Sequence, residues 1–384
     1  MLKPLNFCAL LASVAIAGGP NAWAEQTKAP AATKTAVTVT EIVTGLQNPW
    51  GLQFLPGGRY LVTERPGRLR IISPGGALSA PVAGVPLVMN WGQGGLLDVL
   101  LSPDFETSGT LFLSFAEPRG LFKNGTSVAR ARLVMDATSA RLEDVKIIFR
   151  QEPAIASTYH FGSRLVFDKS GALFVTTGER ATEKDSAQDL ATDLGKVIRI
   201  MPDGSIPKDN PFVGQETRRP EIWSYGHRNL QGAALDPASG QLWTTEHAAK
   251  GGDELNHPEA GKNYGWPIIA WGTDYDGSPI GEGLTAKPGL EQPIYYWNPS
   301  IGTSGLAFYT GSLFKGWTGN ILAGGLAGGV LERLVLDGGK VVAVEHLLTE
   351  RRERIRDVRV GPDSAVYVLT DSQQGKLLRL TPGP

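Results

Sequence analysis

Polar side chains of several different kinds gather in one stretch of this 384-residue chain, residues 221–266. Arg228 and Asn229 come first, in the turn-like GHRNLQG, and Glu246 and the glycine-rich acidic segment 251–256 follow. An unpaired buried polar group costs about 1–3 kcal/mol, so the ends of strands rarely carry this many polar side chains unless those side chains have a function. Satisfied turns would account for any one of these residues. For the cluster as a whole, a ligand site is the interpretation that we favour.

Four more side chains that suit a ligand lie just before expected strands or at their starts. His160 is of the type most easily used as a base near neutral pH, although a lone histidine is more often structural. Gln93 lies between two glycines, which allow close approach to a ligand; the alternative is a turn residue. Arg354 and Arg356 flank Ile355, so both point to one face of a strand. Paired guanidinium groups suit a ligand with carboxylates, whereas the ordinary alternative is a charged edge strand.

Hard oxygen ligands also occur in the cluster and just after it. Asp253, Glu254 and Asp274 lie near the carbonyls of a glycine-rich loop, a composition that suits Ca²⁺ rather than zinc or copper. The sequence contains no EF-hand loop, no dinucleotide-binding G-x-G-x-x-G after a strand, no P-loop and no H-E-x-x-H. Nicotinamide, P-loop and zincin chemistry are therefore not supported.

Composition narrows the class of protein that could carry this site. With 41% hydrophobic and 20% charged residues, the chain fits a soluble globular protein. A formal net charge of -1 gives no electrostatic footprint for nucleic acid or an anionic membrane. The 48 glycines and 26 prolines favour many tight turns and hence many short strands.

The first residues have the pattern of an export signal. Lys3 is followed by an apolar run over residues 7–17 and by an A-x-A cleavage pattern at residues 22–24. That run is too short to span a bilayer as a mature helix. We expect a signal peptide over residues 1–24, a flexible leader over 25–35, and a periplasmic protein. The single cysteine lies in the signal peptide, which leaves no disulfide or cysteine-based zinc site in the mature chain.

A unit of apolar strand, Pro/Asp/Gly turn and further strands recurs about six times over residues 36–384. Its copies begin at residues 50–55, 96–101, 164–167, 233–235, 306–308 and 355–360. This radial repetition predicts an all-β fold, a β-propeller of four-stranded antiparallel blades; a β-sandwich is the structural alternative. The alternating strand at 36–43 would complete the last blade and close the ring.

Six motifs, in their order along the chain, resemble the soluble PQQ-dependent aldose sugar dehydrogenases of the glucose/sorbosone dehydrogenase family. They are GQGGLLD at 92–98, YHFGSRL at 159–165, WSYGHRN at 223–229, GDELN at 252–256, KNYGWP at 262–267 and RIRDV at 354–358. The likeness extends from about residue 39 to residue 380.

The resemblance implies a six-bladed propeller that holds pyrroloquinoline quinone (PQQ) and Ca²⁺. Such an enzyme oxidises the C1 hydroxyl of an aldose to a lactone by hydride transfer to PQQ, with Ca²⁺ as Lewis acid. It implies that His160 takes the hydroxyl proton and that Arg228 also acts in catalysis. The implied cofactor contacts are Gln93, Arg228, Asn229, Tyr275, Ser300, Arg354 and Arg356.

The same resemblance implies two calcium sites. The carbonyls of Ala248 and Ala249 would hold the cofactor's Ca²⁺, and Glu254 and Tyr264 a second ion. The chain departs from the family where Ala248-Ala249 replaces a usual Gly-Pro, and where Ala327 replaces a lysine that some members have. Loss of that lysine removes one positive contact and predicts weaker cofactor binding.

We therefore expect a periplasmic aldose dehydrogenase whose electron acceptor (a dye, a quinone or a cytochrome) is not specified. Two alternatives remain open: a Ca²⁺-dependent lactonase-type hydrolase and a non-catalytic carbohydrate-binding propeller, because fold does not fix function. A lactonase has no use for paired arginines facing a quinone, whereas the missing lysine keeps the binding protein plausible.

Overall fold

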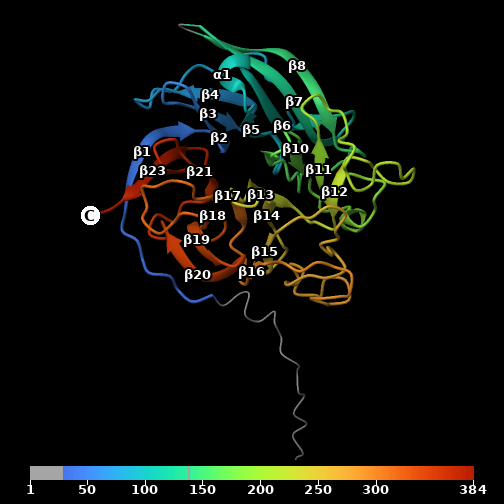
Figure 1. Cartoon of the computed structure of the whole chain (residues 1–384). Helices are drawn as coiled ribbons and strands as arrows, with labels where there is room; N and C mark the ends of the chain where they lie inside the picture. Colours follow the sequence, from blue (N-terminus) through green and yellow to red (C-terminus); the bar gives the residue numbers. More distant parts are fainter. Residues whose placement is uncertain (1–28, 137–138) are drawn as a thin grey trace, which may run out of the picture.

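The computed structural model describes residues 29–136 and 139–384, and six antiparallel sheets stand around a central axis in it (Figure 1). The signal peptide expected over residues 1–24 lies outside the described residues. Five of the sheets have four strands and one has three. The predicted six-bladed β-propeller is confirmed, with the blades following one another in chain order around the ring.

The blades are as follows, each from its innermost strand outward, apart from the sixth, which begins with the strand from the chain's start. The first has β2 (Pro49–Leu55), β3 (Arg59–Glu64) and β4 (Arg68–Ile72); the second has β5 (Leu96–Leu101), β6 (Thr110–Pro118), β7 (Asn124–Met135) and β8 (Ala140–Arg150). The third has β9 (Leu165–Phe167), β10 (Leu173–Thr176), β11 (Lys196–Ile200) and β12 (Ile222–Tyr225); the fourth has β13 (Leu230–Leu235), β14 (Leu242–Glu246), β15 (Asp253–Asn256) and β16 (Tyr295–Trp297). The fifth has β17 (Thr303–Phe308), β18 (Ile321–Gly325), β19 (Val330–Asp337) and β20 (Lys340–Leu347); the sixth has β1 (Val37–Leu46), β23 (Gly375–Pro382), β22 (Val366–Thr370) and β21 (Ile355–Val360).

The first blade departs from the four strands expected of each blade. After β4 the chain turns through Pro74-Gly75-Gly76, and a single antiparallel bridge between Ile72 and Leu78 replaces a fourth strand. Pro81 and Pro86 follow closely, and neither can donate a backbone N–H to a ladder. A full outer strand therefore does not form at this position.

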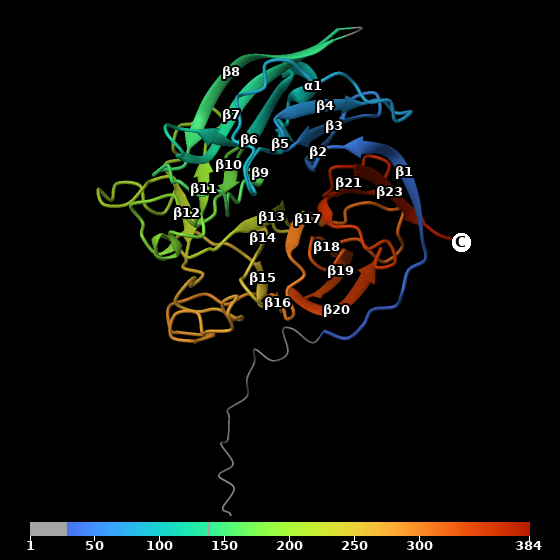
Figure 2. The same ribbon diagram turned by 180° about the vertical axis from the view of Figure 1, so that it is seen from behind.

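The ring closes by pairing its two ends, as predicted. β1 lies antiparallel to β23, with Val39 opposite Leu380, so the last blade contains a strand from each end of the chain (Figure 2). The flexible leader expected over residues 25–35 needs a correction in its described part. The Ala32 N–H donates to the Val344 carbonyl at 2.8 Å, and Ala31 forms a parallel bridge to the same residue of β20. Backbone pairing thus fixes this segment along the fifth blade.

The innermost strands β2, β5, β9, β13, β17 and β21 contact one another in turn around the axis, and β21 meets β2. Apolar side chains fill the spaces between blades; Leu61, Val99 and Leu113, for example, join the first blade to the second. Within the described ranges the only helices are the single turns α1 (Phe105–Ser108) and η1 (Lys184–Ala187). No helix there is long and apolar enough to cross a membrane.

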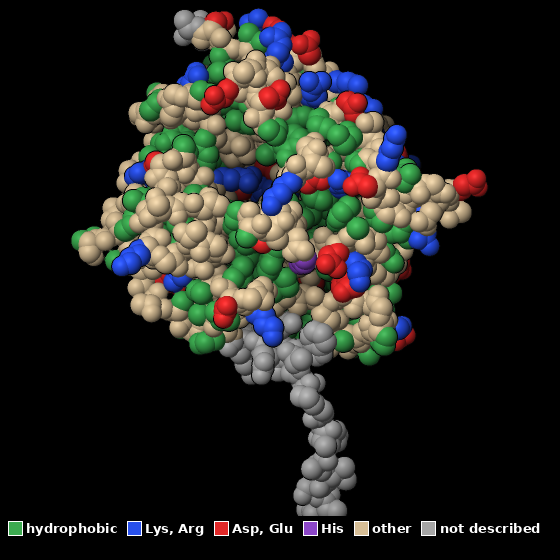
Figure 3. Space-filling model, viewed as in Figure 1, with side chains coloured by type: hydrophobic (Ala, Val, Ile, Leu, Met, Phe, Trp, Pro, Cys, Tyr) green, Lys and Arg blue, Asp and Glu red, His purple; other side chains and the backbone are tan. Residues whose placement is uncertain are grey.

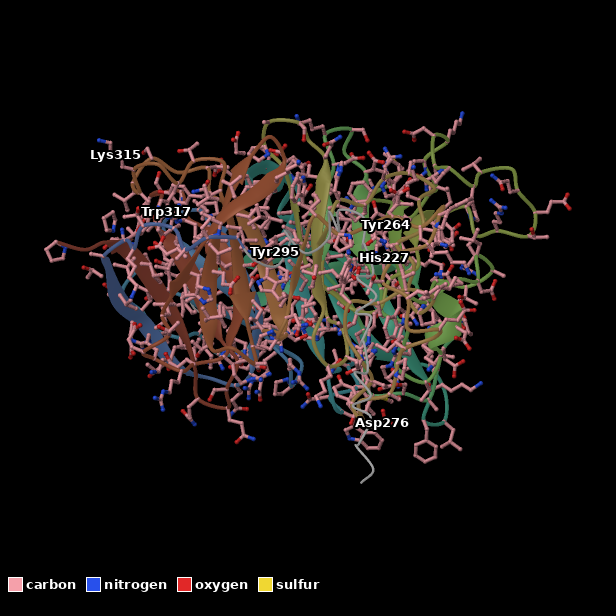
Figure 4. The ribbon with its side chains drawn as sticks, turned by 90° about the horizontal axis from the view of Figure 1, so that it is seen from below. His227, Tyr264, Asp276, Tyr295, Lys315 and Trp317 are labelled. Carbon is pink, nitrogen blue, oxygen red and sulfur yellow. The ribbon has the colours of Figure 1, made fainter. Side chains whose placement is uncertain are left out.

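The two faces of the disc carry different loops. The chain enters each innermost strand from one face, here called the entry face, so turns between second and third strands lie there too. The segment between β15 and β16 reaches the entry face because Thr273 pairs with Lys250 of the β14–β15 turn. Seen edge-on, Asp276 of this segment and Lys315 of the β17–β18 loop lie on opposite faces (Figure 4). The face seen in Figure 3 is hollowed near its middle, with basic side chains in the hollow.

Candidate active site

A cavity of about 470 Å³ opens on the entry face. His160 reaches it from the loop before β9, Glu179 from the loop after β10, and Arg228 from the loop before β13. Gln93 and Tyr275 also line it, from the loop before β5 and from the segment between β15 and β16. The propeller thus brings together side chains from three blades, and four of these five were predicted from the sequence.

His160 is held rigidly at the wall of this cavity. Its ring Nδ1 lies 3.0 Å from Glu179 Oε1, and its backbone N–H donates to Gln93 Oε1 at 2.8 Å. Burial lowers the pKa of His160, and the positive charge of Arg228 lowers it further against the opposing effect of Glu179. The imidazole is therefore neutral near pH 7, which is the state that a base requires.

Glu179 is the functional residue that the sequence analysis missed. Its side chain is buried, and its Oε2 accepts the backbone N–H of Ala181 while Oε1 faces His160. An ionised carboxylate only accepts hydrogen bonds, so the proton of the His160 ring lies on Nδ1. No group in the described part of the chain hydrogen-bonds to Nε2, which leaves its lone pair available. The sign of Glu179 in the sequence is its position, as an acidic residue just after the second strand of a blade.

Arg228 connects the His160–Glu179 pair to the loop that carries Ala248 and Ala249, whose carbonyls are predicted to hold Ca²⁺. Its Nη1 donates to the carbonyls of His247 at 3.2 Å and Ala248 at 2.5 Å, and its Nη2 lies 3.5 Å from the Tyr275 hydroxyl. Its Nε is 4.0 Å from Glu179 Oε1 and is buried without a hydrogen-bond partner. One donor of this guanidinium group is thus free for a ligand.

Asn229 and Arg356 also hold buried donors without partners. The Asn229 Oδ1 accepts from Gly162 N–H at 3.1 Å, whereas its Nδ2 has no partner. Arg356 donates from Nη1 to Gln231 Oε1 at 2.9 Å and from Nη2 to Asp371 at 3.0 Å, and its Nε is unpaired. Unpaired buried donors are costly, so each favours a bound acceptor.

The two predicted arginines of the sixth blade line a second, adjoining hollow of about 130 Å³, which shares Gln93 with the first. Arg354 and Arg356 both donate to Asp371, at 3.2 and 3.0 Å. Burial alone would raise the pKa of Asp371, but the two positive charges hold it well below its usual range. Arg65 lines the same hollow, so three arginines face the single carboxylate of Asp371, and the net positive charge suits an anionic ligand.

The predicted metal ligands fall into two places. Ala249 lines the large cavity, and the Ala248 carbonyl accepts from Arg228. Ala248, Glu254 and Tyr264 all line a second, small cavity of about 20 Å³, which has room for one ion or water and is also lined by Arg228. Burial and the nearby Glu246 carboxylate raise the pKa of Glu254 to about 8.

The Tyr264 hydroxyl donates to the His257 carbonyl and accepts from Glu259 N–H, whereas its main-chain carbonyl accepts no hydrogen bond from the described residues and is the freer oxygen for an ion. Its ring stacks on His227 at 4.8 Å (Figure 4). His227 is fully buried between Ser224 and Glu246 and is structural. Across residues 29–136 and 139–384, no three His, Cys, Asp or Glu side chains cluster as a metal site, so ligands there must include backbone carbonyls.

The three remaining candidates, Asp253, Asp274 and Ser300, lie in different parts of the site. Asp253 accepts backbone N–H groups from Ala248, Gly302 and Thr303, so it fixes the β14–β15 turn against the β16–β17 connection. Asp274 lines the large cavity. Ser300 lines neither of the two adjoining hollows, although its buried hydroxyl has no partner. The role of Ser300 as a cofactor contact stays a prediction.

Comparisons with known proteins agree with this geometry. The family model for glucose/sorbosone dehydrogenase matches residues 46–379. The chain is 44% identical over 353 residues to aldose sugar dehydrogenase YliI of Escherichia coli K12, covering 91% of this chain and 94% of that protein. A crystal structure of a glucose dehydrogenase superposes with a TM-score of 0.87 at 50% identity, covering 90% of this chain and 99% of that one. The PQQ-bound aldose sugar dehydrogenase of Streptomyces coelicolor gives 0.75 at 28% identity, covering 91% and 100%. The chain belongs to the glucose/sorbosone dehydrogenase family.

Proposed function

We propose that this protein is a PQQ- and Ca²⁺-dependent dehydrogenase that oxidises the C1 hydroxyl of aldose sugars to lactones. The observation that carries the proposal is the neutral His160, paired with Glu179, in a cavity beside buried donors that lack partners. A base and a set of unsatisfied donors in one cavity suit a sugar bound next to an acceptor-rich cofactor.

The donors fit a quinone that carries carboxylates. Arg354 and Arg356 supply positive charge, and Arg228 and Asn229 supply unpaired N–H groups. These residues, with Gln93, would hold PQQ across the two hollows. When bound, PQQ supplies the group that accepts hydride from the sugar.

The chain's own residues handle the proton. The Nδ1–H of His160 donates to Glu179, which fixes the ring and directs the Nε2 lone pair to the sugar's C1 hydroxyl. As the hydroxyl gives up its proton to Nε2, the imidazole becomes positive and the Glu179 carboxylate stabilises it. Glu179 is therefore a positioning residue, whereas His160 is the base.

Calcium fits both predicted metal sites, and the two sites differ in what binding of the ion would change. Glu254 and Glu246 face one small cavity, and a divalent cation would relieve their mutual repulsion. At the cofactor the Ala249 carbonyl accepts no hydrogen bond from the described residues, whereas the Ala248 carbonyl is shared with Arg228. A Ca²⁺ ion at these two carbonyls would therefore push the Arg228 guanidinium away, toward Glu179. Export to the periplasm is also proposed, on the sequence of residues 1–24 alone.

The test is a titration of the apo-protein with PQQ in the presence of Ca²⁺, following absorbance and sugar-dependent dye reduction together. We expect saturable binding with the appearance of activity. Absence of binding would refute the proposal. Lactone hydrolysis with Ca²⁺ alone would instead assign a lactonase. Arg354 and Arg356 argue against that function, because a lactonase has no use for paired arginines facing a quinone.

A further inference from the structure

Exposed apolar side chains concentrate on the entry face. Ten large hydrophobic residues are exposed in the described part of the chain, and six of them belong to entry-face loops. These six, called the apolar collar below, are 53–83% exposed: Leu87, Trp91, Leu121, Phe122, Tyr159 and Tyr275. The other four are only 39–42% exposed and lie on outer strands or on loops of the opposite face.

The loops of the apolar collar adjoin one another. The Gln93 N–H, two residues after Trp91, donates to the Thr158 carbonyl at 2.8 Å, which joins the Trp91 loop to the Tyr159 loop. Asn124, next to the β6–β7 turn that carries Leu121 and Phe122, pairs with Ile155 of that same loop. Backbone contacts thus hold the loops that carry Trp91, Tyr159, Leu121 and Phe122 next to one another, and apolar side chains gathered in this way mark an interaction site.

The patch adjoins the mouth of the catalytic cavity. Tyr159 and Tyr275 line that cavity, and the Tyr159 ring lies 6.4 Å from the His160 ring, centroid to centroid. Leu87, Leu121 and Phe122 line none of the hollows around His160. A sugar or a small quinone inside the cavity would not need them. A partner that covers them must therefore be larger than the substrate.

The reaction itself supplies the reason for such a partner. Oxidation of one C1 hydroxyl to a lactone releases two electrons and two protons, and the electrons must leave before the next sugar reacts. Because electron transfer slows steeply with distance, the acceptor must come to the mouth of the cavity. This step of the reasoning rests on the proposed function.

We propose that the apolar collar is the docking surface for a small c-type cytochrome, whose exposed haem edge lies within an apolar surface. Two ferric haems each take one electron and become ferrous, in two successive encounters for each sugar, and the two protons pass to solvent. Redox encounters are among the smallest protein interfaces, in keeping with a patch of six side chains. Aromatic residues are also enriched at the centres of interfaces.

The test uses the full chain loaded with PQQ and Ca²⁺, aldose as donor and purified ferricytochrome c as probe, with the ferrous haem band as readout. The variant is the double change Leu121→Ser and Phe122→Ser, in a turn remote from His160. Leu313→Ser, on the opposite face, is the matched control. We expect kcat/KM for ferricytochrome c to fall about tenfold or more in the double variant and to stay unchanged in the control. Turnover with a small soluble dye should be equal in all three proteins.

Several results would overturn the proposal. Equal cytochrome rates in the wild type and the double variant would remove the collar from docking. Normal dye activity without any cytochrome reduction by the wild type would exclude this class of partner. Binding of the wild type, but not of the double variant, to phosphatidylglycerol vesicles would assign the patch to lipid instead. Absence of dye activity in the loaded wild type would refute the proposed function, and this inference with it.

Discussion

Replacing Glu179 by glutamine is the sharpest perturbation of the proposed base. The Glu179 carboxylate accepts at both oxygens, from His160 Nδ1–H and from the backbone N–H of Ala181. The glutamine amide has only one oxygen that can accept these two hydrogen bonds. Because the Ala181 N–H is always a donor, the amide oxygen must turn to it, and the amide NH₂ then faces His160. An imidazole can change its tautomer, so we expect Glu179→Gln to move the ring proton from Nδ1 to Nε2.

That tautomer has no lone pair directed at the substrate. The variant should therefore lose the general-base contribution, about 10²–10⁴-fold in kcat. Loss of Glu179 also removes the two effects that raise the pKa of His160, so the pKa falls further and the ring stays neutral. Raising the pH should not restore activity, since the defect is the position of the proton rather than its presence. The assay is steady-state dye reduction across a range of pH, with PQQ affinity measured separately by absorbance.

Two controls separate this mechanism from a general loss of structure. PQQ affinity and the thermal midpoint should change little, because the amide still fills the carboxylate's place. In a His160→Ala background, Glu179→Gln should add almost no further loss, because the two residues act as a unit. A kcat within about threefold of the wild type, or a full additional loss in the double variant, would refute the tautomer argument.

Three further predictions concern the base, the cofactor and the metal. His160→Ala should leave PQQ binding nearly intact and lower turnover about 10²–10⁴-fold; an unchanged turnover would remove His160 from the mechanism. Ala327→Lys, at an exposed position beside Leu326 of the arginine-lined hollow, should tighten PQQ binding about fivefold, or about 1 kcal/mol, in an absorbance titration; no gain would show that the lysine's absence does not limit affinity. Since the pKa of Glu254 is raised to about 8, its carboxyl must lose a proton to bind Ca²⁺ below that pH. Calorimetric titrations should therefore show affinity falling about tenfold per pH unit below this value and levelling above it, and Glu254→Gln should abolish that dependence.

The sequence predicted the inner part of each blade better than the outer part. Inner strands such as β5 and β22 are short, mostly apolar segments between turn residues, with Asp98 as the one charged residue of β5, so their ends can be predicted from the sequence. The outermost strands are mostly not predictable from the sequence. β8 is largely exposed along its length and β16 has only three residues, so neither carries a clear period. Their pairing is decided by the neighbouring strand rather than by their own residues.

For the site, residues that precede an innermost strand were predictable and their partners were not. His160, Arg228 and Gln93 stand out because a polar group at a strand entry has few structural uses. Glu179 does not stand out, because an acidic residue at the end of a second strand also occurs as Glu64. There it accepts from Gln47 N–H and Arg68 and has a structural role. Only the fold, which brings residues 160 and 179 within 3.0 Å, distinguishes the two roles.

What keeps these loops in register is a buried ion network in the inner ring. Arg164 Nη1 lies 3.1 Å from both Asp98 and Asp357, and Arg359 bridges the same two carboxylates at 3.3 and 3.1 Å. The network joins the second, third and sixth blades and carries no net charge. The Arg164 guanidinium also lies 4.2 Å above the ring of Trp50, which lines the arginine-lined hollow. Removing one member would leave an uncompensated buried charge, at a cost of about 3–5 kcal/mol. Strand entries held by this network at the centre of the ring therefore position the base and the donors.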